Sequence, residues 1–271
     1  MPLRATESEA GMLKIKSKKQ DVHTSHAKFG PNMSFASTEA YNLLRTNISF
    51  SFPDMLGGKT IGVTSSCPQE GKSTTSINLA YALAEAGNKV LLVDSDMRRP
   101  SICRVLGINM APGLSNLLAG NASDECLHRG VLHPMLSVLV SGDIPPNPSE
   151  LISSAKMGST LEAFKEEYDY VIVDLPPVNL VSDPLSMSKY VDGIIVVVRH
   201  ARTRKSDVVE TVRQLKFVGA RILGFVYNGY KKNKDHYYTN DQKSYYRAAS
   251  LHEEKSDANK KADGKQSSKK K

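Results

Sequence analysis

The chain has 271 residues, of which 40% are hydrophobic and 24% are charged, and its formal net charge is +8. This length and composition fit one well-filled globular core, with no apolar run near the ~20 residues that span a bilayer and no signal-peptide core. We therefore expect a soluble protein that reaches a membrane only through a partner.

The excess positive charge lies at the two ends of the chain. Residues 1–36 carry +3 and residues 230–271 carry +6, whereas the part between them carries −1. Because the globular part is not basic, nucleic acid is not an expected partner, and the Lys-rich ends are expected to be solvated. The cysteines, Cys67, Cys103 and Cys126, contain no CxxC pair, as in a protein of the reducing cytoplasm.

The N-terminal segment, residues 1–36, lacks apolar periodicity and is expected to be a flexible arm. Apolar residues then recur every three or four positions between residues 41 and 52. This spacing predicts a helix that begins near Glu39, with Ser37 or Thr38 as its N-cap.

Short apolar runs and helical patterns alternate along the rest of the chain. The predicted strands cover residues 60–64, 90–94, 136–140, 170–174, 193–198 and 222–227. The predicted helices cover residues 72–86, 161–167 and 206–217. Such continuous apolar runs predict strands buried on both faces, so we expect an α/β domain with a doubly wound, mostly parallel sheet flanked by helices over residues 37–229. Residues 230–271 are expected to be a disordered tail rich in tyrosine and lysine.

The stretch "VTSSCPQEGKSTTS" joins a predicted strand to a predicted helix, the context of a phosphate-binding loop. Its amides and the helix N-terminus would bind a polyphosphate, while Lys72 would reach the β- and γ-phosphates. Ser73 would hold Mg²⁺, and Thr74 would support phosphate or ribose. One departure is Ser66, which stands where the usual pattern has its first glycine.

Three acidic residues end predicted parallel strands. Asp94 and Asp96 lie in "VLLVDSDMRRP", and Asp174 lies in "YVIVDLPP". Strand ends of this kind meet at the ligand-binding edge of an open α/β sheet. A single such aspartate could equally be a helix cap, but three beside a phosphate-binding lysine favour a Mg²⁺ site with a proton acceptor.

These motifs together resemble the bacterial tyrosine kinases, or BY-kinases, which use Walker-type motifs A, A′ and B on the deviant P-loop fold of the MinD and ParA proteins. The resemblance covers about residues 37–229 and implies ATP and Mg²⁺ as cofactors. It implies catalytic roles for Lys72, Asp94, Asp96 and Asp174. It places ATP against Gln69, Glu70, Gly71, Lys72, Ser73, Thr74 and Asn228. It places Mg²⁺ on Ser73, Asp96 and Asp174, and leaves open which of Asp94 and Asp96 takes the phenolic proton.

The tail holds five of the eleven tyrosines, although tyrosine ordinarily favours strands and cores. Composition alone leaves an adhesive or incidental role open. The resemblance implies that the tail is an autophosphorylation cluster, with Tyr237, Tyr238, Tyr245 and Tyr246 as phosphoacceptors. The tether is long enough to reach its own site or that of a neighbour, and the resemblance favours transfer in trans.

The family builds a ring through a helix with the pattern ExxRxxR. This chain has Glu39 and Arg45 at the right spacing, but Asn42 replaces the middle arginine, and a core role for the helix remains open. The resemblance further implies a separate membrane-embedded activator of polysaccharide synthesis, a cognate tyrosine phosphatase and other protein substrates. The kinase would then lie at the inner face of the cell membrane and regulate capsule or exopolysaccharide production.

Two other classes of protein share this fold. A MinD- or ParA-like positioning ATPase usually carries a signature lysine near the start of the loop, where this chain has Ser65 and Ser66. An iron–sulfur scaffold would need closely placed cysteines, which the sequence lacks. A MinD- or ParA-like ATPase remains the alternative function. Formation of phosphotyrosine from ATP by the purified protein would exclude it.

Overall fold

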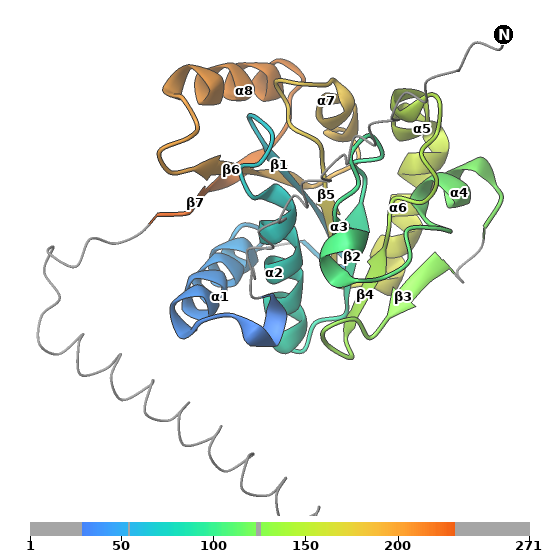
Figure 1. Ribbon diagram of the computed structural model, residues 1–271, viewed down its shortest axis with the longest axis horizontal. Helices are drawn as coiled ribbons and strands as arrows, with labels where there is room; N and C mark the ends of the chain where they lie inside the picture. The colour runs from blue at the N-terminus through green and yellow to red at the C-terminus, as the bar shows by residue number, and fades with distance from the viewer. Residues whose placement is uncertain (1–28, 54, 123–125, 231–271) are drawn as a thin grey trace, which may run out of the picture.

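The computed structural model describes residues 29–53, 55–122 and 126–230. Its centre is a seven-stranded sheet with strand order β3-β4-β2-β5-β1-β6-β7, covered by helices on both faces (Figure 1). The strands are β1 Lys59–Ser65, β2 Val90–Asp94, β3 Leu127–Arg129, β4 Leu136–Leu139, β5 Tyr170–Asp174, β6 Gly193–Arg199 and β7 Ile222–Asn228. The helices are η1 Gly30–Asn32, α1 Phe35–Phe50, α2 Lys72–Glu85, α3 Ile102–Leu106, α4 Leu114–Ala119, α5 Pro148–Ser153, α6 Ala155–Glu167, α7 Asp183–Met187 and α8 Lys205–Phe217.

The strand pairing confirms the predicted doubly wound, mostly parallel sheet. Every neighbouring pair is parallel except β3 and β4, which are antiparallel. The central strands β2, β5 and β1 lie side by side, and the register places Asp94 opposite Asp174 and Val63 opposite Asp174. The strand order therefore brings together the ends of the three strands that lead into the phosphate loop and the acidic motifs.

Alternate residues of the strands supply two separate cores, because successive side chains of a strand point to opposite faces. Ile172 of β5 packs in the cluster that contains the buried residues of α1, α2 and α3. Its neighbour Val171 packs in the cluster under α4, α6 and α7. Ile194 and Val196 of β6 pack against Leu215 of α8 in a third cluster. The predicted burial of the central strands on both faces is thus confirmed.

The first helix begins earlier than the sequence pattern predicts. α1 begins at Phe35, and Ser34 is the N-cap, because its side chain accepts a hydrogen bond from the Ser37 amide. Just before it, the Gly30 amide donates to Asn78 Oδ1 at 3.1 Å, and Phe29 packs against the core. The expected domain boundary at residue 37 therefore falls inside α1.

β7 differs from the prediction of strands buried on both faces. It forms an edge of the sheet, and Phe225 and Tyr227 on it are 53% and 57% exposed. An edge strand has a neighbouring strand on one side only, so its apolar side chains are less completely covered than those of a central strand. The continuous apolar run therefore predicted more burial for β7 than the structure shows. The pattern also missed the short strand β3 and the short helices α3, α4 and α7, and it began α6 six residues late.

None of the helices in the described ranges is long and apolar enough to cross a membrane. The four predicted phosphoacceptor tyrosines and nearly all of the predicted tail lie outside the described residues.

Candidate active site

The predicted phosphate loop joins β1 to the N-terminus of α2. Thr75 is the first residue of α2 whose amide donates within the helix, to the Gly71 carbonyl at 2.9 Å. The amides of Lys72, Ser73 and Thr74 precede it and have no carbonyl to bond inside the helix. Together with the positive end of the helix dipole, they provide the donors of an anion-binding site.

Gly71 must be a glycine for two reasons. Its φ angle is +98°, in the left-handed region, and a Cβ there would overlap the side-chain amide of Asn228. Asn228, at the end of β7, donates from Nδ2 to the Glu70 carbonyl at 3.0 Å. The predicted nucleotide residue Asn228 is thus brought against the phosphate loop, 157 positions away from Gly71 in the sequence.

Lys72 lies between two of the three predicted acids. Its Nζ is 2.9 Å from Asp96 Oδ2 and 3.4 Å from Asp174 Oδ2. Ser73 Oγ donates to the same Asp174 oxygen at 2.5 Å. The structure therefore gathers the lysine, the serine and two carboxylates at the C-terminal edge of the sheet.

The buried charges of the site do not balance. Asp94, Asp96 and Asp174 are all at least 96% buried, and Lys72 forms ion pairs with Asp96 and Asp174. Burial, with the nearby Asp174 carboxylate, raises the pKa of Asp94 to about 7, and burial also raises the pKa of Asp174. For Lys72, burial alone would lower the pKa, but the surrounding carboxylates raise it above its ordinary value. With all three carboxylates ionised, the site would hold more negative than positive charge, and burial and this crowding both favour protonation.

Two predicted acids only two residues apart face different surroundings. Asp94 accepts hydrogen bonds from three backbone amides: that of Asp96 at 3.2 Å, that of Ser101 at 3.2 Å and that of Ile102 at 3.1 Å. These bonds fix the loop after β2 to the start of α3. Asp96 instead directs Oδ2 at Lys72, so it is the acid of the pair that faces the phosphate loop.

The donor set fits Mg²⁺ bound together with a nucleotide. Ser73, Asp96 and Asp174 offer hydroxyl and carboxylate oxygens, the ligands that this ion takes in phosphate-transfer sites, where substrate phosphates complete the coordination. Within the described part of the chain, no group of three or more His, Cys, Asp or Glu side chains could hold a metal ion unaided. A divalent cation would offset the excess buried negative charge.

The sequence interpretation missed two hydroxyl groups, one that contacts Asp174 and one that contacts Ser73. Ser76 Oγ donates to Asp174 Oδ1 at 3.0 Å, and Ser101 Oγ donates to Ser73 Oγ at 2.8 Å. Ser76 lies four positions after Lys72 on α2, so helical periodicity placed it on the same face and could have identified it. Ser101 follows a turn after β2, and no local pattern identified it.

The loop's outer side is held by residues that follow β6. Thr203 Oγ1 donates to Glu70 Oε1 at 2.5 Å, and Arg202 Nη2 donates to Gln69 Oε1 at 2.6 Å. Arg199 Nη1 donates to the Gln69 carbonyl at 3.0 Å. The side chains of Gln69 and Glu70, predicted as ATP contacts, are thus hydrogen-bonded to the protein and support the loop.

Ser66, the residue in place of the usual first glycine, is fully buried. Its Oγ accepts a hydrogen bond from Thr211 Oγ1 of α8 at 2.9 Å. The hydroxyl that a glycine would lack therefore ties the start of the loop to α8.

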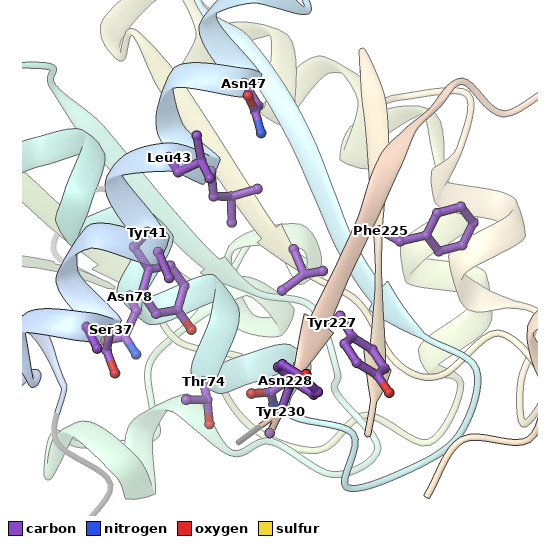
Figure 2. Close-up of a pocket in the computed structure, with 15 residues that line it drawn as sticks. Ser37, Tyr41, Leu43, Asn47, Thr74, Asn78, Phe225, Tyr227, Asn228 and Tyr230 are labelled. Carbon is purple, nitrogen blue, oxygen red and sulfur yellow. The ribbon is translucent and has the colours of Figure 1, made fainter. Parts of the chain in front are cut away.

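A pocket of about 590 Å³ lies beside the loop, between α1, the start of α2 and the edge strand β7. Figure 2 shows Thr74, Asn228 and Tyr230 close together at one end of it. Among the described residues no donor reaches Asn228 Oδ1, while its Nδ2 is engaged with the loop. This end of the pocket adjoins the phosphate-binding amides and has room for further parts of a nucleotide.

The predicted ring residues lie on α1. Glu39 is exposed and accepts a hydrogen bond from Asn42 Nδ2 at 3.3 Å. Arg45 is half-buried and donates from Nη1 to the Ala82 carbonyl of α2 at 3.0 Å. Arg45 thus helps to hold α1 on its own domain, while Glu39 lies at the surface.

The comparisons with known proteins agree with this geometry. A family model described as an AAA domain matches residues 58–218. The tyrosine-protein kinase YwqD of Bacillus subtilis is 37% identical over 198 residues, which cover 73% of this chain and 83% of YwqD.

Solved structures of more than one class match the chain. The kinase domain of the Escherichia coli tyrosine kinase ETK matches with a TM-score of 0.69 and 31% identity, covering 74% of this chain and 79% of that one. The septum site-determining protein MinD of Pyrococcus horikoshii, complexed with Mg-ADP, matches with a TM-score of 0.55 and 26% identity, covering 65% and 72%. Both structures share the fold of this chain, and the identity is higher to the kinase domain. The chain therefore belongs to the family of bacterial tyrosine-protein kinases, built on the P-loop fold that this family shares with MinD.

Proposed function

We propose that this protein is an ATP-dependent tyrosine kinase that phosphorylates its own C-terminal tail. The observation that carries the proposal is the position of Lys72, held at the N-terminus of α2 between Asp96 and Asp174. In this position the ammonium group can move from the carboxylates to the β- and γ-phosphates of ATP and stabilise charge on the transferred group. Bound Mg²⁺ would neutralise phosphate charge, with Ser73, Asp96 and Asp174 as its protein ligands.

Asp96 is the better candidate to accept the phenolic proton. A tyrosine hydroxyl has an unperturbed pKa of about 10 and is protonated at neutral pH, so a nearby carboxylate must take the proton during transfer. Asp94 uses both of its oxygens to bind backbone amides, whereas Asp96 binds one amide through Oδ1 and directs Oδ2 at Lys72. We therefore assign Asp94 the support of the loop.

The nucleoside would lie at the pocket end formed by Thr74 and Asn228 (Figure 2). Thr74 belongs to the first turn of α2, next to the residues that bind phosphate. Asn228 Oδ1 could accept a hydrogen bond from the exocyclic amine of adenine, while Nδ2 stays on the Glu70 carbonyl. This geometry supports the predicted contact between Asn228 and the base.

The predicted acceptors are Tyr237, Tyr238, Tyr245 and Tyr246, which follow the end of β7 in sequence. Tyr230, the last residue that the structure describes, lines the pocket beside the proposed nucleotide site. Transfer in trans would require neighbouring copies, and the exposed Glu39 on α1 is available for such a contact. Each phosphate adds nearly two negative charges, which would weaken docking near buried carboxylates and so release the neighbour.

The biological setting follows from family membership. We infer that the kinase acts in capsule or exopolysaccharide production with a membrane-embedded activator, at the inner face of the membrane. A cognate tyrosine phosphatase would reverse the modification, and other proteins would be further substrates.

Phosphosite mapping tests the activity. The full chain is incubated with ATP and Mg²⁺, with and without the cytoplasmic segment of a candidate activator, and its intact mass and phosphopeptides are measured. We expect several added phosphates confined to the tail tyrosines, in amounts that rise with the activator. ATP turnover without phosphotyrosine in either condition would instead indicate a MinD-like positioning ATPase, the second candidate that the shared fold supports.

Mixing two variants distinguishes transfer in trans from transfer in cis. A Lys72→Met chain, which retains its tail, is combined with an active chain truncated after residue 230. If a neighbouring copy carries out the transfer, we expect phosphate on the tail tyrosines of the Lys72→Met chain. An unlabelled tail, with the truncated chain still active on a tyrosine peptide, would establish transfer in cis.

A further inference from the structure

Arg98, the first of two arginines in the "VDSDMRRP" segment, contacts a buried carboxylate on a different part of the sheet edge. Arg98 Nε donates to Asp183 Oδ2 at 2.9 Å, and Arg98 Nη2 is 3.4 Å from Asp183 Oδ1. The Asp183 side chain is 1% exposed and that of Arg98 is 40% exposed. A two-pronged pair of this kind fixes the orientation of both side chains, and Lys cannot reproduce it because its ammonium is a single point charge.

A third element joins this pair. Ser149 Oγ, at the start of α5, donates to Asp183 Oδ1 at 2.7 Å and accepts from Arg98 Nη2 at 2.7 Å. Arg98 follows β2, Ser149 follows β4 and Asp183 follows β5. The cluster therefore connects the segments that leave three neighbouring strands on the ligand-binding edge of the sheet.

The loop after β2 is thus held from two directions. On the inner side, Asp96 is held by Lys72, which also contacts Asp174 after β5. On the outer side, Arg98 is held by Asp183, which also follows β5. The Arg99 amide closes the turn between them by donating to Asp96 Oδ1 at 3.0 Å.

These two connections respond differently to a nucleotide. Lys72 must leave the carboxylates if it is to bind phosphate, so the inner connection weakens when ATP enters the site. In the outer connection, the Arg98 guanidinium is already engaged by Asp183 and Ser149. After ATP has bound, Arg98 and Asp183 still hold the outer side of the turn that carries Asp96. At the start of the turn, Ser95 stays bonded to the Asp174 carbonyl and the Asp96 amide to Asp94. Bound Mg²⁺ would take the place of Lys72 between Asp96 and Asp174.

We propose that Arg98, with Asp183 and Ser149, is a positioning residue that holds Asp96 in its reactive orientation once Lys72 has moved to the nucleotide. The inference rests on the proposed kinase function for its effect on rate, but its effect on the loop is independent of that function. Loss of the cluster should slow the transfer step more than it weakens the binding of ATP.

The test compares four variants of the full chain with the parent protein: Arg98→Met, Arg98→Lys, Asp183→Asn and the double variant Arg98→Met/Asp183→Asn. Arg99→Met is the matched control, because the neighbouring Arg99 is exposed and uses its backbone amide, not its side chain, in the turn. For each, the thermal midpoint, the dissociation constant of ATP, kcat for tyrosine phosphorylation and hydrogen exchange of residues 95–102 are measured.

We expect kcat to fall by about 10- to 100-fold in Arg98→Met, with the ATP dissociation constant changed less than about threefold. Arg98→Lys should recover only part of the rate. Arg98→Met leaves the buried Asp183 charge unpaired and should lower the thermal midpoint. The double variant removes that charge and should recover stability but not rate, and residues 95–102 should exchange faster in both variants than in Arg99→Met.

A double variant that recovers rate together with stability would overturn the proposal, since the cluster would then serve only the fold. Unchanged hydrogen exchange of residues 95–102 in a folded Arg98→Met protein would overturn it too. If the parent protein binds ATP but forms no phosphotyrosine, the kinase proposal fails, while the exchange measurement still decides whether Arg98 holds the loop.

Discussion

The two sides of the phosphate loop are built from contacts of opposite character. On the side of β2 and β5, Lys72 meets buried carboxylates whose combined negative charge exceeds its own. On the side of β6, Arg199, Arg202 and Thr203 bind the loop through hydrogen bonds that pair each donor with an acceptor. The first side is incomplete without a cation and a phosphate, whereas the second side is complete in the protein alone. Substitutions on the first side should therefore alter chemistry, and those on the second side should alter mainly stability.

The largest effect is expected from Lys72→Met. Removing a preorganised charge from the transferring group should lower the rate of tyrosine phosphorylation by roughly 10² to 10³-fold. Quantitative phosphopeptide analysis of the purified variant measures this loss. Lys89→Met is the control, because Lys89 makes a half-exposed ion pair with Glu167 whose contribution is small. Phosphotyrosine formation at the parent rate in Lys72→Met would contradict the proposed role of the loop.

Next in size is the contrast between Asp96→Asn and Asp94→Asn. Loss of the proton acceptor in Asp96→Asn should reduce kcat by about 10² or more with little change in thermal midpoint. Asp94→Asn should act mainly on stability at pH 5, by about 1 to 3 kcal/mol, because one of three backbone amides loses its acceptor. Steady-state kinetics and thermal unfolding of both variants test the assignment, and the reverse pattern would make Asp94 the base.

The pH dependence of stability sharpens the same contrast. The pKa of Asp94 is raised to about 7 in the folded, nucleotide-free protein, above the value near 4 in an unfolded chain. A raised pKa means that this group's contribution to stability is present at low pH and is lost as the pH rises from about 4 through about 7. The destabilisation caused by Asp94→Asn should therefore shrink between pH 5 and pH 8 in denaturant titrations. A difference that stays constant across this range would show that Asp94 is ionised throughout.

A smaller effect is expected on the other side of the loop. Thr203→Val removes the hydroxyl that donates to Glu70 but keeps the shape of the side chain. The free energy of unfolding should fall by about 1 kcal/mol, and kcat should change less than about threefold. A fall in kcat as large as that expected for Asp96→Asn would show that the two sides of the phosphate loop do not differ in their effect on catalysis.

The sequence predicted the site where its signals are local. The spacing of Gly71, Lys72 and Ser73 within one turn, and acids placed directly after apolar strands, identified the loop and the carboxylates. The different roles of Asp94 and Asp96 were not predictable, because they depend on which backbone amides the turn after β2 brings to each carboxylate.

The long-range contacts were not predictable either. Arg98 meets Asp183 across 85 positions and Arg202 meets Gln69 across 133. These contacts depend on strand order, which periodicity does not reveal. The early start of α1 was missed for a local reason, since Ser34 caps a helix whose first turn carries no regular apolar spacing.

The serine at the start of the phosphate loop has a thermodynamic consequence. Ser66 is held by Thr211, and the middle of the loop is held by Thr203 and Arg202 before any ligand arrives. The conformational entropy of ordering the loop is therefore lost during folding and not during nucleotide capture. The affinity for nucleotide then depends on the contacts made in a preformed loop and on the movement of Lys72 from the carboxylates to the phosphates. Regulation would then act on the binding of the substrate tyrosine.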